Sequence, residues 1–404
     1  MDFAPTPLAE QLSEQLSDFV TTQVIPAIPR AHAEIEAAGD PHHHTTVIEE
    51  LKTEAKARGL WNLFMPDPRY GPALSNLDYA PLCEILGSTP LAPEATNCAA
   101  PDTGNMEVLA EFGTDIVREQ YLQPLVDGDI RSCFAMTEPW VASSDATNIV
   151  STITRDGDDY IVRAHKWFTT GAASPRCAVA IVMGVSDPDA DRHRRHSMVV
   201  VPMDAPGVSI VRSLPVYGRI EGSGHCETLF DGVRVPKEYL LGEEGGGFAI
   251  AQARLGPGRI HHCMRAIGAA EHALRLMCER AQMRTTFGTV LADQGVIQTW
   301  IAESRIAINQ ARLLTLKAAW KIDIAGKKAA SQEIGEIKVA VTRTATKVID
   351  HAVQVFGAAG VTDDWPLAEM WANARTLQLV DGPDEVHLQQ IARRELRQYE
   401  HLRP

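Results

Sequence analysis

The sequence predicts an α+β protein with an N-terminal helical domain, a middle β-domain and a C-terminal four-helix bundle. Helical apolar spacing dominates residues 1–129, β-branched runs alternate with turns over residues 130–240, and long helical patterns fill residues 241–404. A chain of 404 residues is long enough for two or three domains that share a core. We therefore expect three domains with these boundaries.

The N-terminal region is expected to be helical because of the spacing of its apolar residues. Between Leu8 and Val20 they recur close to the helical period. A second helix is expected in TTVIEELKTEAKARGL, with Thr45 or Thr46 as its N-cap and Gly59 as its end. Further helical segments follow up to about residue 128.

The middle region contains short strands separated by turns. ITRDGDDYIV predicts a β-hairpin, because an Asp-Gly pair, Asp156 and Gly157, separates two alternating segments. The charged, proline-containing segment 186–196 is expected to be a solvated loop between two strands.

After residue 247 the pattern becomes helical again and predicts a bundle. Helical apolar spacing covers residues 248–283, 293–326, 330–357 and 366–399, with glycine-containing breaks between them. Helices of this length usually pack against one another as a bundle.

Composition excludes several classes of protein. The net charge of −14 argues against non-specific binding to nucleic acid or to an anionic membrane. No apolar stretch is long enough to span a membrane. The seven cysteines form no CxxC pair, and the first residues lack the basic and apolar regions of a secretory signal. We expect reduced thiols and a cytoplasmic location.

Two groups of histidines invite a metal interpretation, His42–His44 and the pair His261 and His262. Adjacent histidines point in different directions on a helix or strand, and no carboxylate at a suitable spacing completes a site. We expect a solvated loop and an ordinary helix, and no metal.

Four segments carry the functional signal: FAMTEPWVASSDA (134–146), HKWFTTGA (165–172), VQVFGAAG (353–360) and LVDGPDEVH (379–387). In this order and spacing they resemble the flavin-binding and catalytic segments of the acyl-CoA dehydrogenase family. MTEPxVASSDATNI, LGPGRIHHCMR and DGPDEVH are similar to the branch that contains acyl-CoA dehydrogenase family members 10 and 11. The resemblance covers nearly the whole chain and implies FAD as the cofactor.

The first two segments supply one set of expected flavin contacts. Hydroxyl groups and backbone amides suit the polar edge of a flavin, which needs both donors and acceptors. Alone, these segments would be a polar turn and an aromatic residue in a strand core. The resemblance implies that the flavin contacts are Phe134, Ala135, Met136, Thr137, Ser143, Trp167 and Thr169.

A second set of expected cofactor contacts lies in the helical region. In the family, an Arg-x-x-Phe-Gly arginine and a following glutamine reach the flavin pyrophosphate of a neighbouring subunit. An arginine suits a diphosphate because its planar group offers parallel donors. Alone, these residues would be a helix end with glycine breaks. The resemblance implies a homodimer or homotetramer and contacts from Arg284, Thr286, Phe287, Gln294, Gln354, Val355, Gly357, Pro383 and Glu385.

The resemblance also implies where the substrate and the catalytic base lie. Ser144, Arg259 and Gly382 match substrate-contact positions. A subset of the family places its base one residue before this arginine, where Gly258 stands here. The remaining candidate is Asp381, where most members have a glutamate that is one methylene longer. From the residues alone, Asp381 is either a base or the N-cap of the helix that follows, and Asp384 is another candidate for that cap.

The expected reaction is FAD-dependent α,β-dehydrogenation of an acyl-CoA to trans-2-enoyl-CoA, as in fatty acid β-oxidation and lipid metabolism. Asp381 would remove the α-proton, flavin N5 would accept the β-hydrogen as hydride, and an electron-transfer flavoprotein would accept the electrons. Acyl chain length is left open.

Two alternatives remain open at this point. One is a flavoprotein similar to nitroalkane oxidase, a branch that uses an aspartate at this position and needs no CoA. The other is a non-catalytic relative of the fold that acts in assembly.

Overall fold

The computed structural model describes residues 2–220 and 222–403, with only the backbone of Leu255 and Pro257. The chain forms two compact units. One, here called the bundle unit, comprises Met1–Val20, Leu74–Ala92 and Gly256–Pro404, and the other, the sheet unit, comprises Thr21–Ala73 and Pro93–Leu255. The units cut across the three expected domains, and that division of the sequence remains a prediction.

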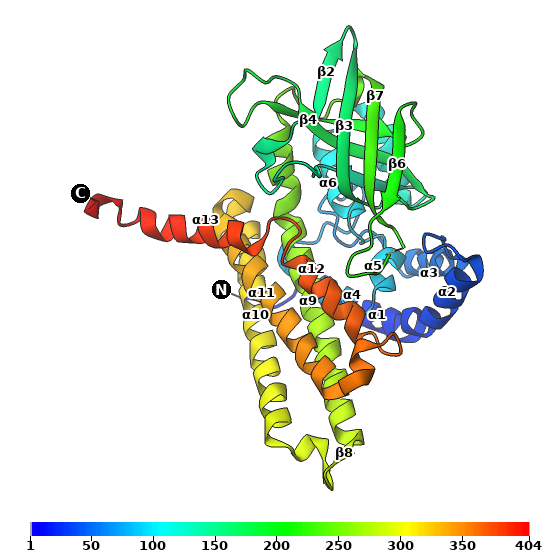
Figure 1. Ribbon diagram of the computed structural model, residues 1–404, viewed down its shortest axis with the longest axis vertical. Coiled ribbons are helices and arrows are strands. Elements are labelled where there is room, and N and C mark those ends of the chain that lie inside the picture. Colours follow the sequence, from blue (N-terminus) through cyan, green and yellow to red (C-terminus); the bar gives the residue numbers. More distant parts are fainter. Residues whose placement is uncertain (1, 221, 404) are drawn as a thin grey trace. The chain divides into compact units, whose positions relative to one another are not determined.

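The sheet unit contains a seven-stranded sheet in the hydrogen-bonded order β1-β4-β2-β3-β7-β6, with β5 paired to β4. β1 and β2 run parallel to β4, and the other neighbours are antiparallel. Figure 1 shows β2, β3, β7 and β6 side by side. The strands are β1 (Arg131–Ala135), β2 (Thr152–Asp156), β3 (Asp159–Thr170), β4 (Cys177–Val185), β5 (His196–Pro202), β6 (Val208–Ser213) and β7 (His225–Pro236).

The predicted hairpin joins β2 to β3. Asp156 pairs with Asp159, so that two residues form the turn, and the first of them, Gly157, has a φ of 64°. Glycine adopts this conformation without the steric cost that a side chain imposes. The segment before His196 is a loop between β4 and β5, as expected.

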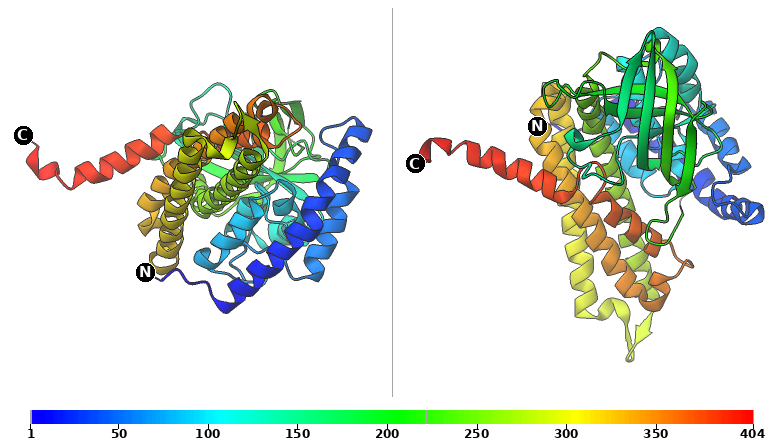
Figure 2. Two further views of the ribbon diagram at one scale, coloured as in Figure 1. Left: turned by 90° about the horizontal axis from the view of Figure 1, so that it is seen from below. Right: turned by 45° about the horizontal axis from the view of Figure 1, so that its top comes forward.

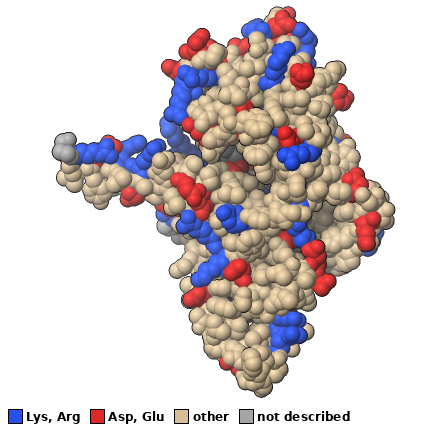
Figure 3. Space-filling view, viewed as in Figure 1, with Lys and Arg blue, Asp and Glu red and all other residues tan. Residues whose placement is uncertain are grey.

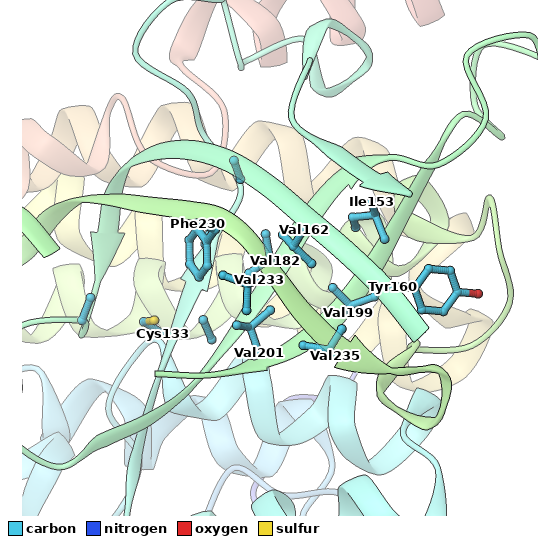
Figure 4. Packing of buried hydrophobic residues seen from close by; sticks show 14 of the residues in the cluster. Cys133, Ile153, Tyr160, Val162, Val182, Val199, Val201, Phe230, Val233 and Val235 are labelled. Carbon is cyan, nitrogen blue, oxygen red and sulfur yellow. The ribbon is translucent and has the colours of Figure 1, made fainter. Parts of the chain in front are cut away.

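The core of the sheet unit is made of β-branched and aromatic side chains on one face of the strands. Figure 4 shows Val162, Val182 and Val233 close together, with Phe230 beside them and Tyr160 at the far end of the cluster. All five are buried. The alternation of buried and exposed residues along β3 and β7 produces this face.

Short helices complete the sheet unit: α2 (Ile25–Ala38), α3 (Thr46–Ala57), α6 (Asp102–Phe112), α7 (Asp115–Val117) and α8 (Gln123–Asp127). Thr45 is the N-cap residue of α3, and the chain turns at Gly59 after the helix ends, as predicted. Asp102 at the start of α6 is buried, pairs with Arg131 and accepts from the backbone of Ser132. This contact joins α6 to β1.

The bundle unit consists of helices and one short hairpin of β8 (Thr285–Thr286) and β9 (Thr289–Val290). α10 and α11 run alongside each other in every view (Figures 1 and 2). α9 begins in the sheet unit and continues into the bundle unit from Gly256. The helices are α1 (Pro7–Phe19), α4 (Asn76–Leu86), α9 (Gly247–Met283), α10 (Gly295–Ala329), α11 (Ser331–Phe356), α12 (Leu367–Leu377) and α13 (Asp384–Arg397).

The helical pattern over residues 366–399 is not one helix. α12 ends at Leu377 and α13 begins at Asp384, with a turn between them. Asp381 and Gly382 have φ angles of 55° and 95°, which a right-handed helix does not contain. Pro383 follows and has no N–H to donate to a helical hydrogen bond. The apolar spacing continued across the turn and therefore did not indicate it.

Charges of both signs share the surface. Acidic and basic side chains are interspersed on the face in Figure 3, and basic residues run along α13. In the part of the chain that the structure describes, no helix combines the length and the apolar character that crossing a bilayer requires.

α4 and α9 approach each other closely because both carry glycine at the contact. A Cβ at Gly268 of α9 would lie 2.0 Å from the carbonyl oxygen of Glu84, and one at Gly87 would lie 2.2 Å from that of Arg265. The side chain of Arg312 on α10 then donates to both carboxylate oxygens of Glu84, at 2.7 and 2.8 Å. Backbone contact and ion pairing together hold α4 in the bundle.

We predict that Gly268→Ala lowers the free energy of unfolding by about 1–3 kcal/mol, because the added methyl group forces α4 and α9 apart. Gly258→Ala is the matched control on the same helix, since a Cβ added there would meet no atom within 4 Å. That change should be neutral or stabilise by up to about 1 kcal/mol. Urea denaturation measures both. Equal stabilities of the two variants would contradict the close contact.

Candidate active site

The first two motif segments lie against each other in the sheet unit. The hydroxyl of Thr137 donates to the carbonyl of Trp167 at 2.6 Å, and the backbone N–H of Trp167 donates to the carbonyl of Thr137 at 3.1 Å. These reciprocal hydrogen bonds hold the loop after β1 on the end of β3. The structure therefore brings together two segments that the sequence assigned to the same flavin.

A buried ion pair between Glu138 and Lys166 holds the loop that follows β1. The carboxylate of Glu138 accepts from Lys166 Nζ at 2.7 Å and from the backbone N–H groups of Val150 and Ser151 at 2.9 Å. Burial alone would raise the pKa of Glu138, but Lys166 and these hydrogen bonds outweigh it and hold that pKa below its usual value. Burial lowers the pKa of Lys166 to about 8, against the opposing effect of Glu138. The pair is thus charged at neutral pH.

β3 carries an irregularity at its aromatic residues. Its pairing with β7 shifts between Lys166 and Thr169, and Phe168 has a φ of 49°. Such a bulge redirects side chains at the edge of a site. The ring of Phe168 is exposed and meets the half-buried ring of Trp167 edge to face, with centroids 5.2 Å apart. Together they present an aromatic surface.

Other expected flavin contacts in the sheet unit have internal roles. Thr169 is buried, and its hydroxyl pairs with that of Thr228 at 2.9 Å. The hydroxyl of Ser143 accepts from the N–H of Glu138 at 2.9 Å, whereas Ser144 is exposed. The role of each toward a cofactor stays a prediction.

Arg254 lies over Phe134 on β1, and the sequence analysis did not predict this contact. The guanidinium carbon of Arg254 on α9 lies 3.9 Å from the ring centroid of Phe134, and its Nε donates to Asn105 at 3.1 Å. Ala135 is buried and Met136 partly buried. Arg254 lies just before the quoted segment LGPGRIHHCMR, but only the fold places it over a strand residue.

In the bundle unit, Asp381 lies on the turn between α12 and α13. Its carbonyl accepts from Nε and Nη2 of Arg259 at 3.2 and 2.9 Å, and from Nε2 of His387 at 3.3 Å. A Cβ at Gly382 would lie 3.0 Å from Nε2 of His387, so the turn is packed on that ring. Three predicted site residues, Asp381, Gly382 and Arg259, are therefore brought together.

Asp381 does not cap the helix that follows it. The N-cap residue of α13 is Pro383, with no side-chain cap, and Asp384 accepts from Arg343 at 2.7 Å. Instead, Oδ2 of Asp381 lies 3.0 Å from Nε2 of His262. The sequence analysis expected an ordinary helix at His262, which lies on α9, and did not single out this contact. The place of His262 three residues after Arg259, on the same helix face, was the available signal.

The surroundings of Asp381 are rich in basic side chains. Lys338 on α11 is fully buried, and its Nζ donates to the carbonyl of Leu377. Burial lowers the pKa of Lys338. Burial and the charges of Arg259 and Lys338 lower the pKa of His387 to about 4, so that its ring is neutral at pH 7. Asp381 thus lies among the basic side chains of Arg259 and Lys338 and the neutral ring of His387.

The second set of predicted cofactor residues lies elsewhere in the bundle unit. Arg284, Thr286 and Phe287 belong to the β8–β9 hairpin, at the tip of the bundle away from α13 (Figure 1), with Gln294 just before α10. Arg284 and Phe287 are exposed. Gln354 and Gly357 at the end of α11 are exposed, Val355 is buried, and Pro383 and Glu385 begin α13.

Comparison with known proteins identifies relatives along the chain. Three family models match: acyl-CoA dehydrogenase N-terminal domain over residues 6–129, middle domain over 133–233 and C-terminal domain over 245–396. The probable acyl-CoA dehydrogenase FadE2 of Mycobacterium tuberculosis is 57% identical over 98% of this chain and 97% of its own length. Human acyl-CoA dehydrogenase family member 11 is 48% identical over 98% of this chain, which spans 51% of that protein.

Solved structures have the same fold. A protein from Mycobacterium abscessus is 48% identical and superposes with a TM-score of 0.95, covering 98% of this chain and 100% of its own. Butyryl-CoA dehydrogenase from Megasphaera elsdenii is 27% identical with a TM-score of 0.83, over 98% and 100% of the two chains. The expected fold, with helical, β and helical parts, is confirmed.

We predict that Lys166→Met lowers stability by about 3–5 kcal/mol, because Glu138 is left charged and buried without its partner. The loop that follows β1 should also become mobile. Lys237→Met, which breaks the exposed pair with Asp158, is the control and should change stability little. Urea denaturation and hydrogen exchange at residues 137–151 measure the effects. Similar losses in both variants would show that burial of the pair is unimportant.

Proposed function

Because this chain belongs to the acyl-CoA dehydrogenase family, we propose that it catalyses FAD-dependent α,β-dehydrogenation of an acyl-CoA to trans-2-enoyl-CoA. The chain is an oxidoreductase of this family. What we propose is its reaction, its substrate class and the residues that act. The observation that carries it is the turn at Asp381. This turn presents a carboxylate at the position that the resemblance assigns to the base, and Arg259 and His387 hold its backbone.

Asp381 is the proposed base for the α-proton. A proton α to a thioester is weakly acidic, and it can be removed only if the developing enolate is stabilised. A base must also be held in place, since a displacement of about 1 Å can cost a hundredfold in rate. The left-handed backbone at Asp381, clamped through its carbonyl, fixes where the short side chain begins. The positive charges of Arg259 and Lys338 favour the ionised carboxylate.

The residues of the sheet unit fit a flavin. The bulge in β3 presents the rings of Trp167 and Phe168 beside a loop that is held by Thr137 and the buried pair of Glu138 and Lys166. When bound, FAD would accept the β-hydrogen of the substrate as a hydride at N5. The chain's own contribution there is an aromatic surface beside a loop that hydrogen bonds hold in place.

The finer features of the proposal concern substrate and partners. Exposed Ser144, with Arg259 and Gly382, would contact the acyl-CoA, whose chain length is left open. An electron-transfer flavoprotein would accept the electrons, and a role in fatty acid β-oxidation would follow. Exposed Arg284 and Phe287 at the bundle tip support a homodimer or homotetramer in which a neighbour's cofactor is contacted. A cytoplasmic location stays a prediction.

We predict that the purified protein has a flavin absorbance spectrum that bleaches when saturated acyl-CoAs are added without oxygen. Asp381→Asn should keep the flavin but slow bleaching at least about a hundredfold, because an amide cannot accept the α-proton. Asp364→Asn, at an exposed position of the same unit, is the control. Normal bleaching of the Asp381 variant would remove this residue as the base.

The other outcomes of this titration separate the alternatives. A bound flavin that no acyl-CoA bleaches, together with oxygen consumption on a nitroalkane, would favour the nitroalkane-oxidase-like reaction. A protein without flavin that cannot be reconstituted with FAD would favour a role in assembly. Either result would contradict the proposed function.

We predict that Arg284→Ala weakens FAD binding by at least about tenfold, because a charge-assisted contact to the pyrophosphate is lost. Arg275→Ala on α9, whose side chain pairs with Glu279 four residues away, is the matched control and should bind FAD normally. Flavin retention on gel filtration and an equilibrium titration of the apoprotein measure both. Undiminished affinity in the Arg284 variant would refute this contact.

A further inference from the structure

His262 faces the proposed base from the neighbouring helix. Its Nε2 lies 3.0 Å from Oδ2 of Asp381, and both side chains are only about one-fifth exposed. Arg259, His262 and Arg265 follow one another at intervals of three residues and share a face of α9. The helix that holds the backbone of Asp381 through Arg259 therefore also contacts its carboxylate through His262.

The tautomer of His262 follows from its contact with Arg265. Nη2 of Arg265 lies 3.1 Å from Nδ1 of His262. A guanidinium group only donates hydrogen bonds, so Nδ1 must be the acceptor and carry no hydrogen. The hydrogen of the neutral ring is then on Nε2, which donates to Oδ2 of Asp381. Burial lowers the pKa of His262, although Asp381 opposes this, and the ring is neutral at neutral pH.

Resting on the proposed function, we propose that His262 is a positioning residue for Asp381. Its Nε2–H holds Oδ2 and so restricts the orientation of the carboxylate that takes the α-proton. Such a contact suits an aspartate, whose side chain is one methylene shorter than that of glutamate. Held at its backbone by Arg259 and at its carboxylate by His262, Asp381 loses the freedom that would otherwise reduce its rate as a base.

His262 neither gives up nor takes up a proton in the proposed reaction. The α-C–H bond breaks, its proton forms a bond to the carboxylate of Asp381, and its electron pair remains on the substrate as the enolate. Nε2 of His262 keeps its hydrogen throughout. Because Arg265 occupies Nδ1, no proton can enter the ring there, and His262 does not relay the proton to solvent.

The pH dependence of this pair involves more groups than the two partners. The charged and titratable side chains around it are Arg259, His261, Cys263 and Arg265 on α9, Lys327 on α10, Lys338 on α11, and Asp384 and His387 on α13. None of these replaces the donor on Nε2. Removing it destabilises the ionised carboxylate, so the acid limb of the activity profile should move to higher pH.

The first test compares His262→Leu with His262→Gln. The leucine variant removes the donor, whereas the glutamine amide can reach the carboxylate. His261→Leu is the matched control, because this neighbouring ring is buried against Tyr79, with centroids 4.8 Å apart, on another face of α9. We expect His262→Leu to slow flavin reduction about ten- to a hundredfold with little change in KM and to shift the acid limb. His262→Gln should recover most of the rate, and His261→Leu should leave the acid limb unchanged.

Two results of this comparison would overturn the proposal. Equal losses in His262→Leu and His261→Leu would mean that only packing matters. A glutamine variant as slow as the leucine variant would mean that the donor is unimportant.

A second test asks whether His262 compensates for the short base. In the parent protein Asp381→Glu should be slow, because a longer carboxylate meets the His262 ring. Combining Asp381→Glu with His262→Ala should give a faster enzyme than either change alone. A double variant slower than both single variants would contradict the proposed compensation.

A third measurement separates this inference from the proposed function. Histidine-selective ¹⁵N NMR of the intact flavoprotein reports the tautomer and titration of His262 without any substrate. We expect the Nε2–H form, and a further fall in the pKa of His262 in Asp381→Asn, since Asp381 raises that pKa. An Nδ1–H form, or a titration that Asp381→Asn leaves unchanged, would overturn the pairing even if the protein bleaches with acyl-CoA. The expected NMR result in a protein that no acyl-CoA bleaches would uphold the pairing and reject only the reaction.

Discussion

The left-handed turn at Asp381 and Gly382 is the constraint on which the candidate site depends. A non-glycine residue with a φ of 55° is uncommon, and it persists only when its surroundings hold it. Here the carbonyl of Asp381 accepts from Arg259 on α9 and from His387 on α13. The turn interrupts the helical pattern and directs a carboxylate toward α9.

The environment of the turn shows how burial and charge decide protonation. His262 and His387 have lowered pKa values because burial disfavours the imidazolium, and because Arg265, Arg259 and Lys338 already supply positive charge. Two neutral rings therefore act as hydrogen-bond donors with fixed tautomers. Their neutrality matters, because additional cations beside Arg259 and Lys338 would increase the cost of burying this cluster.

In the sheet unit a buried and fully paired charge holds the loop that follows β1. Glu138 is buried but accepts three hydrogen bonds, from Lys166 and from two backbone N–H groups. A satisfied pair of this kind is costly to break and so restricts the loop to one conformation. Since Lys166 directly precedes Trp167, the pair also fixes the start of the bulge that turns the aromatic rings outward. The buried pair thus anchors both the loop after β1 and the start of the bulge in β3.

The sequence by itself determined the order of helical and β regions, the family resemblance, and the identity of Asp381, Arg259 and Trp167 as candidates. Periodicity and motif spacing carry that information because they depend on residues near one another in the chain. Only the tertiary structure decided that the last long helical pattern is two helices, that His262, His387 and Lys338 lie around Asp381 in the bundle unit, and that Arg254 lies over Phe134 in the sheet unit. Arg259 and Asp381 are 122 positions apart, and a helical period states which face of a helix is apolar without stating what packs on it. Contacts between distant segments arise from packing, which fixes their distances and hence their chemistry.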